Sequence, residues 1–252
     1  MTSTTNHRFT ASDGVELVWH EMGQGRPVIL LHGLFSSAEM NWLRFGHADA
    51  IASEGFRVIM PDLRAHGASG KPHDAERYPE GILARDVGEL VAHLELNTFD
   101  LGGFSLGART TVEAIGKGLR PRKAVIAGMG LQGLKGWARR KQFFLDAIDK
   151  VDTSERGDPH WLAIQFMKTM KVDSAAAALL LHSFSDGEDS WLEAFTMPTL
   201  VVIGSEDDDN GSGEDLAAAL SDATYRQVPG THMSSVTKPE FGAEIARFLA
   251  SP

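Results

Sequence analysis

The chain of 252 residues lacks cysteine, which excludes disulfide bonds, a thiol nucleophile and cysteine-based metal sites. Positive charge is also scarce, because the chain has 24 lysines and arginines but 34 aspartates and glutamates. The resulting net charge of −10 disfavours nucleic acid or an anionic membrane as a partner. No apolar run approaches the length of a membrane span, and the polar residues 1–6 lack the apolar stretch of a secretion signal. We therefore expect a cytoplasmic protein without a membrane span.

What the chain does contain is an alternation of strand-like and helix-like patterns. Residues 8–11 and 15–19 flank an Asp-Gly pair, which is typical of a β-hairpin. Segments with helical periodicity, such as 82–94 and 239–249, lie among short apolar runs of the kind found in buried parallel strands. These runs are at 27–31, 57–60, 124–127 and 200–203. The order predicts an α/β fold with a mostly parallel sheet covered by helices on both faces.

Residues 131–196 interrupt this alternation, because they contain helical patterns but no convincing strand. The candidate helices are at 136–149, 159–170, 174–184 and 190–195. A segment of this length between two strands is typical of a helical insertion rather than a simple crossover, so we expect a core of residues 1–130 and 197–252. Most aromatic side chains of the insertion are expected to pack between its helices, with a minority lining an apolar pocket. The basic run 139–141 is expected on a solvated helix face, with contact to an anionic substrate as the alternative.

A Gly-x-Ser-x-Gly pentapeptide, residues 103–107, directly follows an apolar run and precedes a helix-like stretch. In that position the pentapeptide predicts a tight strand-to-helix turn, which presents the Ser105 hydroxyl above the sheet. Gly103 and Gly107 are expected there because the strand and the helix pass so close to the turn that a Cβ would clash. Ser105 is therefore the predicted nucleophile.

A serine hydroxyl needs a base, and the base needs an orienting acid. His232 follows a strand-like run and precedes the last helical pattern, so we expect it in a loop at the carboxyl end of a strand, where α/β sheets place their sites. The acid is expected between the serine and the histidine along the chain. Asp207 ends a Gly-x-x-Asp turn after a buried strand and is the predicted acid, with Asp208 as the alternative.

An acyl-transfer site also needs N–H donors for the developing oxyanion. One predicted donor is the backbone N–H of Leu106 at the start of a helix, and the other is that of Leu34, with Phe35 as the alternative. Metal-site patterns fail, because the acidic run 206–215 lacks EF-hand spacing and no histidine-rich zinc pattern occurs. We expect neither a metal nor a cofactor.

As a set, these motifs resemble the α/β-hydrolase family. The resemblance covers nearly the whole chain and rests on His32-Gly33, the loop 62–69, the pentapeptide at Ser105, Gly204-Ser205-Glu206-Asp207 and Gly230-Thr231-His232. It implies a three-layer αβα sandwich with an eight-stranded sheet, a helical cap formed by residues 131–196, and a Ser105–His232–Asp207 triad. Ala65 and Ala108 stand where that family usually has glycine.

The same loop, Asp62-Leu63-Arg64-Ala65-His66-Gly67-Ala68-Ser69, contains polar groups that could suggest chemistry of their own. We expect hydrogen bonds to fix Asp62 and His66, because buried polar groups must be paired, and we assign them no catalytic or metal-binding role.

The resemblance implies hydrolysis of a small-molecule ester through an acyl-enzyme, and we expect a small to medium, fairly apolar carboxylic ester or lactone. Serine at the turn argues against the dehalogenase and epoxide-hydrolase branches, which need a carboxylate nucleophile. A carbon–carbon bond hydrolase or an acyltransferase would use the same triad, and a near-inactive ligand receptor is a further alternative. The sequence leaves the oligomeric state open.

Overall fold

The computed structural model describes residues 3–252, and its centre is one sheet of eight strands in the order β1-β2-β4-β3-β5-β6-β7-β8. Strand β2 pairs antiparallel with β1 and β4, and every other pairing is parallel. The strands are β1 (Thr5–Thr10), β2 (Glu16–Gly23), β3 (Arg26–Leu31), β4 (Phe56–Asp62), β5 (Asp100–Phe104), β6 (Ala124–Ala127), β7 (Thr199–Gly204) and β8 (Ala223–Val228). The hairpin and the mostly parallel sheet predicted from the sequence are confirmed.

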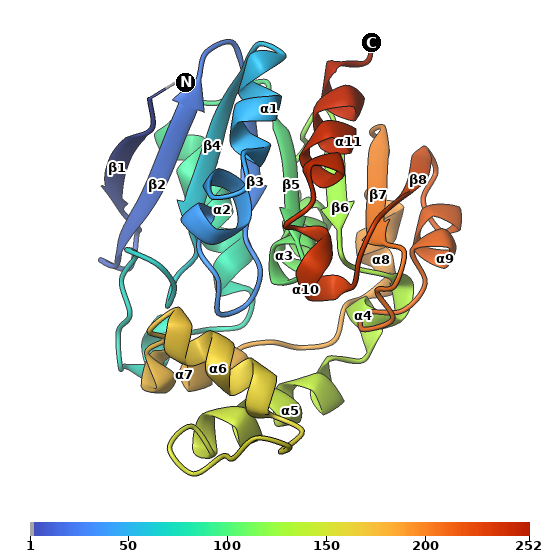
Figure 1. Cartoon of the computed structure of the whole chain (residues 1–252). Helices are drawn as coiled ribbons and strands as arrows, with labels where there is room; N and C mark the ends of the chain where they lie inside the picture. The colour runs from blue at the N-terminus through green and yellow to red at the C-terminus, as the bar shows by residue number, and fades with distance from the viewer. Residues whose placement is uncertain (1–2) are drawn as a thin grey trace.

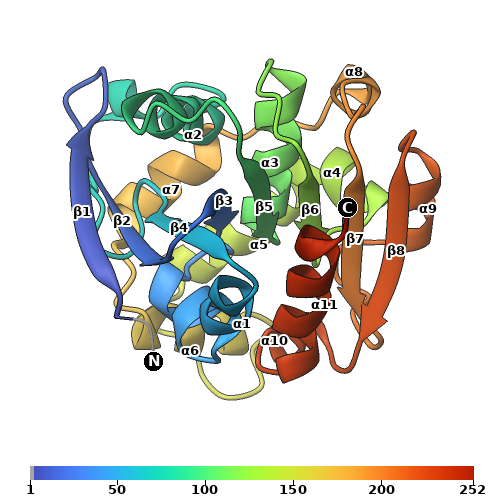
Figure 2. The same ribbon diagram turned by 90° about the horizontal axis from the view of Figure 1, so that it is seen from above.

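Helices cover both faces of this sheet, which gives three layers (Figure 2). Helices α1 (His47–Ser53) and α11 (Pro239–Ala250) pack on one face, and α2 (Ile82–His93) and α3 (Leu106–Gly116) lie on the other. Because strand side chains alternate between faces, neighbours in β3 enter different cores. Ile29 belongs to the core under α2 and α3, whereas Leu30 belongs to the core under α1 and α11.

Five helices stand between β6 and β7, where the sequence predicted an insertion. They are α4 (Leu131–Lys135), α5 (Trp137–Asp149), α6 (Trp161–Thr169), α7 (Ser174–His182) and α8 (Asp189–Glu193). Figure 1 shows α5, α6 and α7 beyond one end of the sheet. Within the insertion Trp137, Trp191 and Phe195 are buried, Trp191 against Gly116 of α3 in the core, whereas Phe143 is exposed. That these residues act as a cap over a substrate stays a prediction.

The short elements differ from the sequence expectations. A π-helical turn η1 (Glu39–Leu43), a 3₁₀ turn η2 (Ala75–Arg77) and helix α9 (Gly213–Ala218) were not predicted, since so few residues show no clear periodicity. His232 was expected in a loop, but it is the first residue of the short helix α10 (His232–Ser235). Among residues 3–252, no helix combines the length and the apolar character needed to cross a bilayer.

At the start of α3 the backbone packs too closely for a side chain to fit. A Cβ at Gly107 would stand 2.2 Å from the carbonyl oxygen of Leu31, and one at Gly103 would stand 2.4 Å from the carbonyl carbon of Gly107. Glycine is therefore required at both positions, because the helix touches the ends of two strands with its backbone.

We predict opposite effects for two glycine-to-alanine changes. Gly107→Ala should destabilise the protein by about 3 kcal/mol or more, because backbone on both sides cannot yield. Gly88→Ala, in helix α2 with nothing within 4 Å of the new Cβ, should stabilise it by about 0.5–1 kcal/mol. Urea unfolding of both variants measures the difference. Equal effects would show that the Gly107 contact is looser than described.

Candidate active site

Ser105 occupies the turn between β5 and α3 in a backbone conformation that residues other than glycine rarely adopt. Its φ is 55° and its ψ is −113°, and its N–H donates to the carbonyl of Ala127 at 2.8 Å. Strained conformations of this kind persist only where the surrounding structure enforces them, and they concentrate at functional sites. The side chain stands at the N-terminus of α3 and is 8% exposed.

His232 lies between Ser105 and an acid. Its Nε2 is 3.0 Å from Ser105 Oγ, and its Nδ1 is 2.9 Å from Asp207 Oδ2. The ring stacks on Phe104 with centroids 4.8 Å apart, and Thr231 caps the first turn of α10. A neutral imidazole with its proton on Nδ1 donates to Asp207 and accepts from the serine hydroxyl. The three side chains predicted from separate parts of the chain thus form one continuous hydrogen-bonded set.

The acidic run after β7 separates into buried and exposed members. Asp207 is 8% exposed, and its Oδ1 also accepts the N–H of Asp209 at 3.2 Å. Asp208, the alternative acid, has an exposed side chain. The structure therefore brings Asp207, and not Asp208, to the imidazole.

Asn210 also contacts the imidazole, and sequence reasoning missed it. The side chain is 2% exposed, and its Nδ2 donates to the Gly128 carbonyl at 2.8 Å and lies 3.1 Å from His232 Nδ1. Its Oδ1 accepts from Arg140 of α5, so this arginine is not simply on the solvated face that we expected. The side chain of Arg139 lies outside the described part of the structure. An asparagine within an acidic run carries no pattern that would have singled it out.

Among the described residues, the backbone N–H groups of Leu34 and Leu106, the predicted oxyanion donors, have no hydrogen-bond partner of the kind that the alternative, Phe35, has. The Phe35 N–H donates to His66 Nε2 at 3.0 Å and is therefore occupied. Within residues 3–252, no hydrogen bond uses the Leu34 N–H. Leu106 is the first residue of α3, where a backbone N–H has no acceptor inside the helix. Leu34 and Leu106 thus retain the N–H groups that an oxyanion needs.

Two buried histidines brace the loop that carries Leu34. His32 Nε2 accepts the N–H of Leu63 at 2.9 Å, and His66 Nδ1 bonds the carbonyl of Arg64 at 2.9 Å. Burial, reinforced by the neighbouring His32, lowers the pKa of His66 to about 3, and burial also lowers the pKa of His32. Both rings are therefore neutral at pH 7, which lets each of them accept a backbone N–H.

Asp62 stabilises the same region through hydrogen bonds to the backbone. Its carboxylate accepts the N–H groups of Ala38 at 2.9 Å and Ala68 at 2.8 Å, and it bonds His20 at 3.2 Å. Burial opposes its ionisation, but these hydrogen bonds outweigh burial and hold the pKa of Asp62 below its ordinary value. Hydrogen bonds thus fix Asp62 within the loop, as the sequence predicted.

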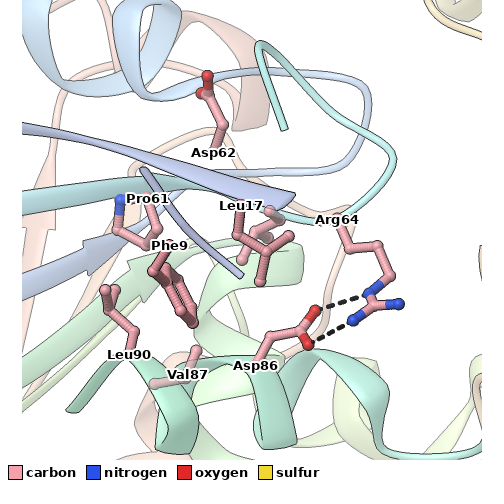
Figure 3. A pocket seen from close by; sticks show the side chains of 9 residues that line it. Phe9, Leu17, Pro61, Asp62, Arg64, Asp86, Val87 and Leu90 are labelled. Carbon is pink, nitrogen blue, oxygen red and sulfur yellow. Dashed lines mark hydrogen bonds and ion pairs between the residues drawn. The ribbon is translucent and has the colours of Figure 1, made fainter. Parts of the chain in front are cut away.

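Arg64 anchors the other side of the loop (Figure 3). The fully buried guanidinium bonds both carboxylate oxygens of Asp86 at 2.8 and 2.9 Å, and it also reaches Asp13 in the first hairpin turn. In Figure 3, Asp62 points away from this pair. The cavity beside it, of about 10 Å³, has room for no more than a water molecule.

Among the described residues, one group near the site has the geometry to ligate a metal ion. Asp207, Asp209 and His232 bring ligand atoms within 4.8 Å of one another. A metal held there would compete with the Nδ1–Asp207 hydrogen bond, because the other ring nitrogen faces Ser105. The hydrogen-bonded set and a metal site are thus mutually exclusive arrangements of the same side chains.

Similarity to known proteins identifies the family of this chain. A family model described as "alpha/beta hydrolase fold" matches residues 26–125. The chain is 33% identical to a non-heme chloroperoxidase of Kitasatospora aureofaciens, in a match that covers 95% of this chain and 98% of that protein. The chain belongs to the α/β-hydrolase family. The family resemblance drawn from the sequence motifs is confirmed.

Solved structures of other proteins share this fold over nearly the whole chain. An enol-lactonase from Burkholderia xenovorans superposes with a TM-score of 0.77 at 20% identity, over 97% of this chain and 100% of that one. An esterase from Exiguobacterium antarcticum gives a TM-score of 0.77 at 18% identity, over 98% and 100%. At such identities the similarity establishes the fold alone.

The neutral histidines of this α/β hydrolase predict a pH-dependent stability. The pKa of His66 is about 3 in the folded chain and about 6.5 in an unfolded chain. Between these values the unfolded state binds the additional proton, so stability falls as the pH drops below about 6.5. The slope for one histidine approaches about 1.4 kcal/mol per pH unit.

Urea unfolding between pH 6.5 and 4.5 measures this slope. His66→Gln should lower the slope of the unfolding free energy against pH by close to the contribution of one proton, about 1.4 kcal/mol per pH unit. This holds whatever the absolute stability of the variant. His182→Gln is the matched control, because that side chain is exposed. An unchanged slope in His66→Gln would mean that His66 is protonated in the folded protein.

Proposed function

We propose that this chain is a serine hydrolase that cleaves small to medium, fairly apolar carboxylic esters or lactones through an acyl-enzyme. The observation that carries the proposal is the unbroken set of hydrogen bonds from Ser105 through His232 to Asp207. Ser105, His232 and Asp207 are the nucleophile, base and orienting acid of this proposal. The serine in the turn also separates the chain from hydrolases that need a carboxylate nucleophile.

The proposed reaction follows from these contacts. His232 Nε2 takes the proton of Ser105 as Oγ attacks the ester carbonyl, and Asp207 stabilises the imidazolium that forms. His232 then passes this proton to the departing alcohol, and the acyl group stays on Ser105. A water molecule, activated by His232 in the same way, releases the carboxylic acid and regenerates the serine.

The N–H groups of Leu34 and Leu106 are the proposed donors to the oxyanion of each tetrahedral intermediate. Leu34 lies in the loop that follows β3, and Leu106 is the first residue of α3. Preorganised donors of this kind contribute about 2.7–4 kcal/mol each to transition-state stabilisation. Helices α4 to α8 are the proposed cap, and the bond from Arg140 to Asn210 connects this cap to the side chain that lies beside His232.

The chloroperoxidase name of a relative supports a second candidate. Hydrogen peroxide, in place of water, would bond the acyl carbon, and Ser105 would leave with a proton. The product would be a peracid, which transfers its outer peroxy oxygen to a halide ion and thereby gives hypohalous acid and the carboxylate. Bromination that needs a carboxylate, peroxide, bromide and an intact Ser105 would favour this candidate. A carbon–carbon bond hydrolase and an acyltransferase remain alternatives on the same side chains.

The role of Ser105 is tested by covalent labelling and turnover. A fluorophosphonate should modify the protein once, at Ser105, and Ser105→Ala should abolish both labelling and hydrolysis of p-nitrophenyl esters. Mass spectrometry locates the label. A series of acyl chain lengths should show multiple turnovers, whereas one stoichiometric burst would point to a near-inactive receptor. Labelling of Ser105→Ala at another residue would remove the assignment.

The identity of the acid is tested by a matched pair. Asp207→Asn should lower kcat by on the order of 10⁴, because the imidazole would lose the acceptor that selects its tautomer. Asp208→Asn, one residue away and exposed, should stay close to wild type. Steady-state kinetics with and without EDTA complete the test. A larger loss in Asp208→Asn would shift the acid by one residue, and a loss in EDTA restored by a divalent ion would favour the metal arrangement.

A further inference from the structure

A cavity of about 240 Å³ lies where the turn between α6 and α7 meets two loops of the core. The core contributes residues 35–36, which follow β3, and residues 65–67 and Lys71, which follow β4. The inserted segment contributes residues 170–172. Phe35 directly follows Leu34, so the cavity adjoins the loop that carries a proposed oxyanion donor.

The chemistry of the lining is uneven. Phe35, Met170 and Val172 supply apolar side chains, while Lys71 and Lys171 supply two ammonium groups. None of the nine lining residues has a carboxylate. His66 also lines the cavity, but it accepts a backbone N–H and its burial keeps it neutral. In a chain of net charge −10, this cavity therefore has a locally positive lining.

The two ammonium groups retain donors for a ligand. Lys71 Nζ donates to the carbonyls of Gly67 at 2.5 Å and Ser69 at 3.0 Å, which leaves the third of its N–H donors. Within residues 3–252, no hydrogen bond or ion pair engages the Lys171 ammonium. The acid two residues further on, Asp173, is already held by His73 at 2.9 Å and caps α7.

Ser36 supplies a second, independent observation. This lining residue is 5% exposed, and its hydroxyl has no hydrogen-bond partner among the described residues. A buried hydroxyl without a partner is destabilising, so an acceptor provided by a ligand would relieve the deficit.

We propose that this cavity binds a carboxylate carried on a short apolar chain. The carboxylate lies between Lys71 and Lys171, and the chain packs against Phe35 and Val172. The carboxylate belongs either to the end of the substrate remote from the ester or to a separate small acid. The first alternative rests on the proposed ester hydrolysis, and the second is independent of that proposal.

Binding is measured without turnover in a Ser105→Ala background. Titration calorimetry with butyrate should give a Kd of about 1 mM, a value reasonable for so small a ligand. Butyramide, its neutral isostere, should bind at least tenfold more weakly. The Lys71→Met/Lys171→Met double variant should lose at least tenfold for butyrate, and Lys168→Met, an exposed lysine in α6 that does not line the cavity, should lose nothing. Equal binding of butyrate and butyramide, or no binding of either, would overturn the proposal.

Lys171 permits a test that separates ligand binding from folding. It has a φ of 52° at the end of α6, a left-handed conformation that favours glycine. Lys171→Gly should therefore raise Tm by about 2 °C and still weaken butyrate binding. Glu95 has the same φ of 52° at the end of α2, so Glu95→Gly should raise Tm similarly with butyrate binding unchanged. Unaltered binding in Lys171→Gly would contradict the proposed role.

Kinetics of the chain with Ser105 intact separate the two sources of the carboxylate. If it belongs to the substrate, monomethyl succinate should exceed methyl butyrate in kcat/KM by at least tenfold, and the double lysine variant should abolish this preference. If it belongs to a separate acid, the two esters should react alike, and butyrate should alter the rate for methyl butyrate in the wild type but not in the double lysine variant, whereas product inhibition at Ser105 would persist in both. Failure to hydrolyse either ester would count against the proposed function, whereas failure of the Ser105→Ala calorimetry would count against the cavity proposal alone.

Discussion

The contact between the backbones of Gly107 and Leu31 is the constraint on which the rest of the site depends. The missing side chain allows α3 to start against the end of β3, and this sets the strained turn at Ser105. The same approach brings the N-terminus of α3 beside the loop after β3, which carries Leu34. One steric condition therefore sets the Ser105 turn and holds the start of α3 against the loop after β3. Asp207, which follows β7, and His232, which follows β8, then complete the hydrogen-bonded set with Ser105.

Uncharged imidazoles hold the neighbouring loop in place. His32 and His66 each accept a backbone N–H through a neutral ring nitrogen, and burial favours this neutral form by lowering the pKa of both rings. The His66 bond occupies the Phe35 N–H, whereas no hydrogen bond among residues 3–252 uses the N–H of Leu34. The cavity lined by Lys71 and Lys171 borders this same loop, and a ligand there would contact the residue next to the donor.

Much of this arrangement could be predicted from the sequence, because long elements and tight turns leave strong patterns. The buried strands, the turn at Ser105 and the helical insertion all have such patterns, and Ala65 was noticed where glycine is usual. Its φ of 67° explains why glycine is the common choice there. Short elements such as α9 and α10 were missed because a single helical turn shows no periodicity. Asn210 and the paired lysines could not be found, since only the fold brings residues from distant segments together.

The most direct test of the central claim is the crystal structure of the protein after reaction with a phosphonate. The account predicts phosphorus bonded to Ser105 Oγ, with a phosphonyl oxygen about 2.7–3.1 Å from the N–H groups of both Leu34 and Leu106. His232 would remain bonded to Asp207. A phosphonyl oxygen that faces solvent or the Phe35 N–H, or an adduct on any other side chain, would contradict the account.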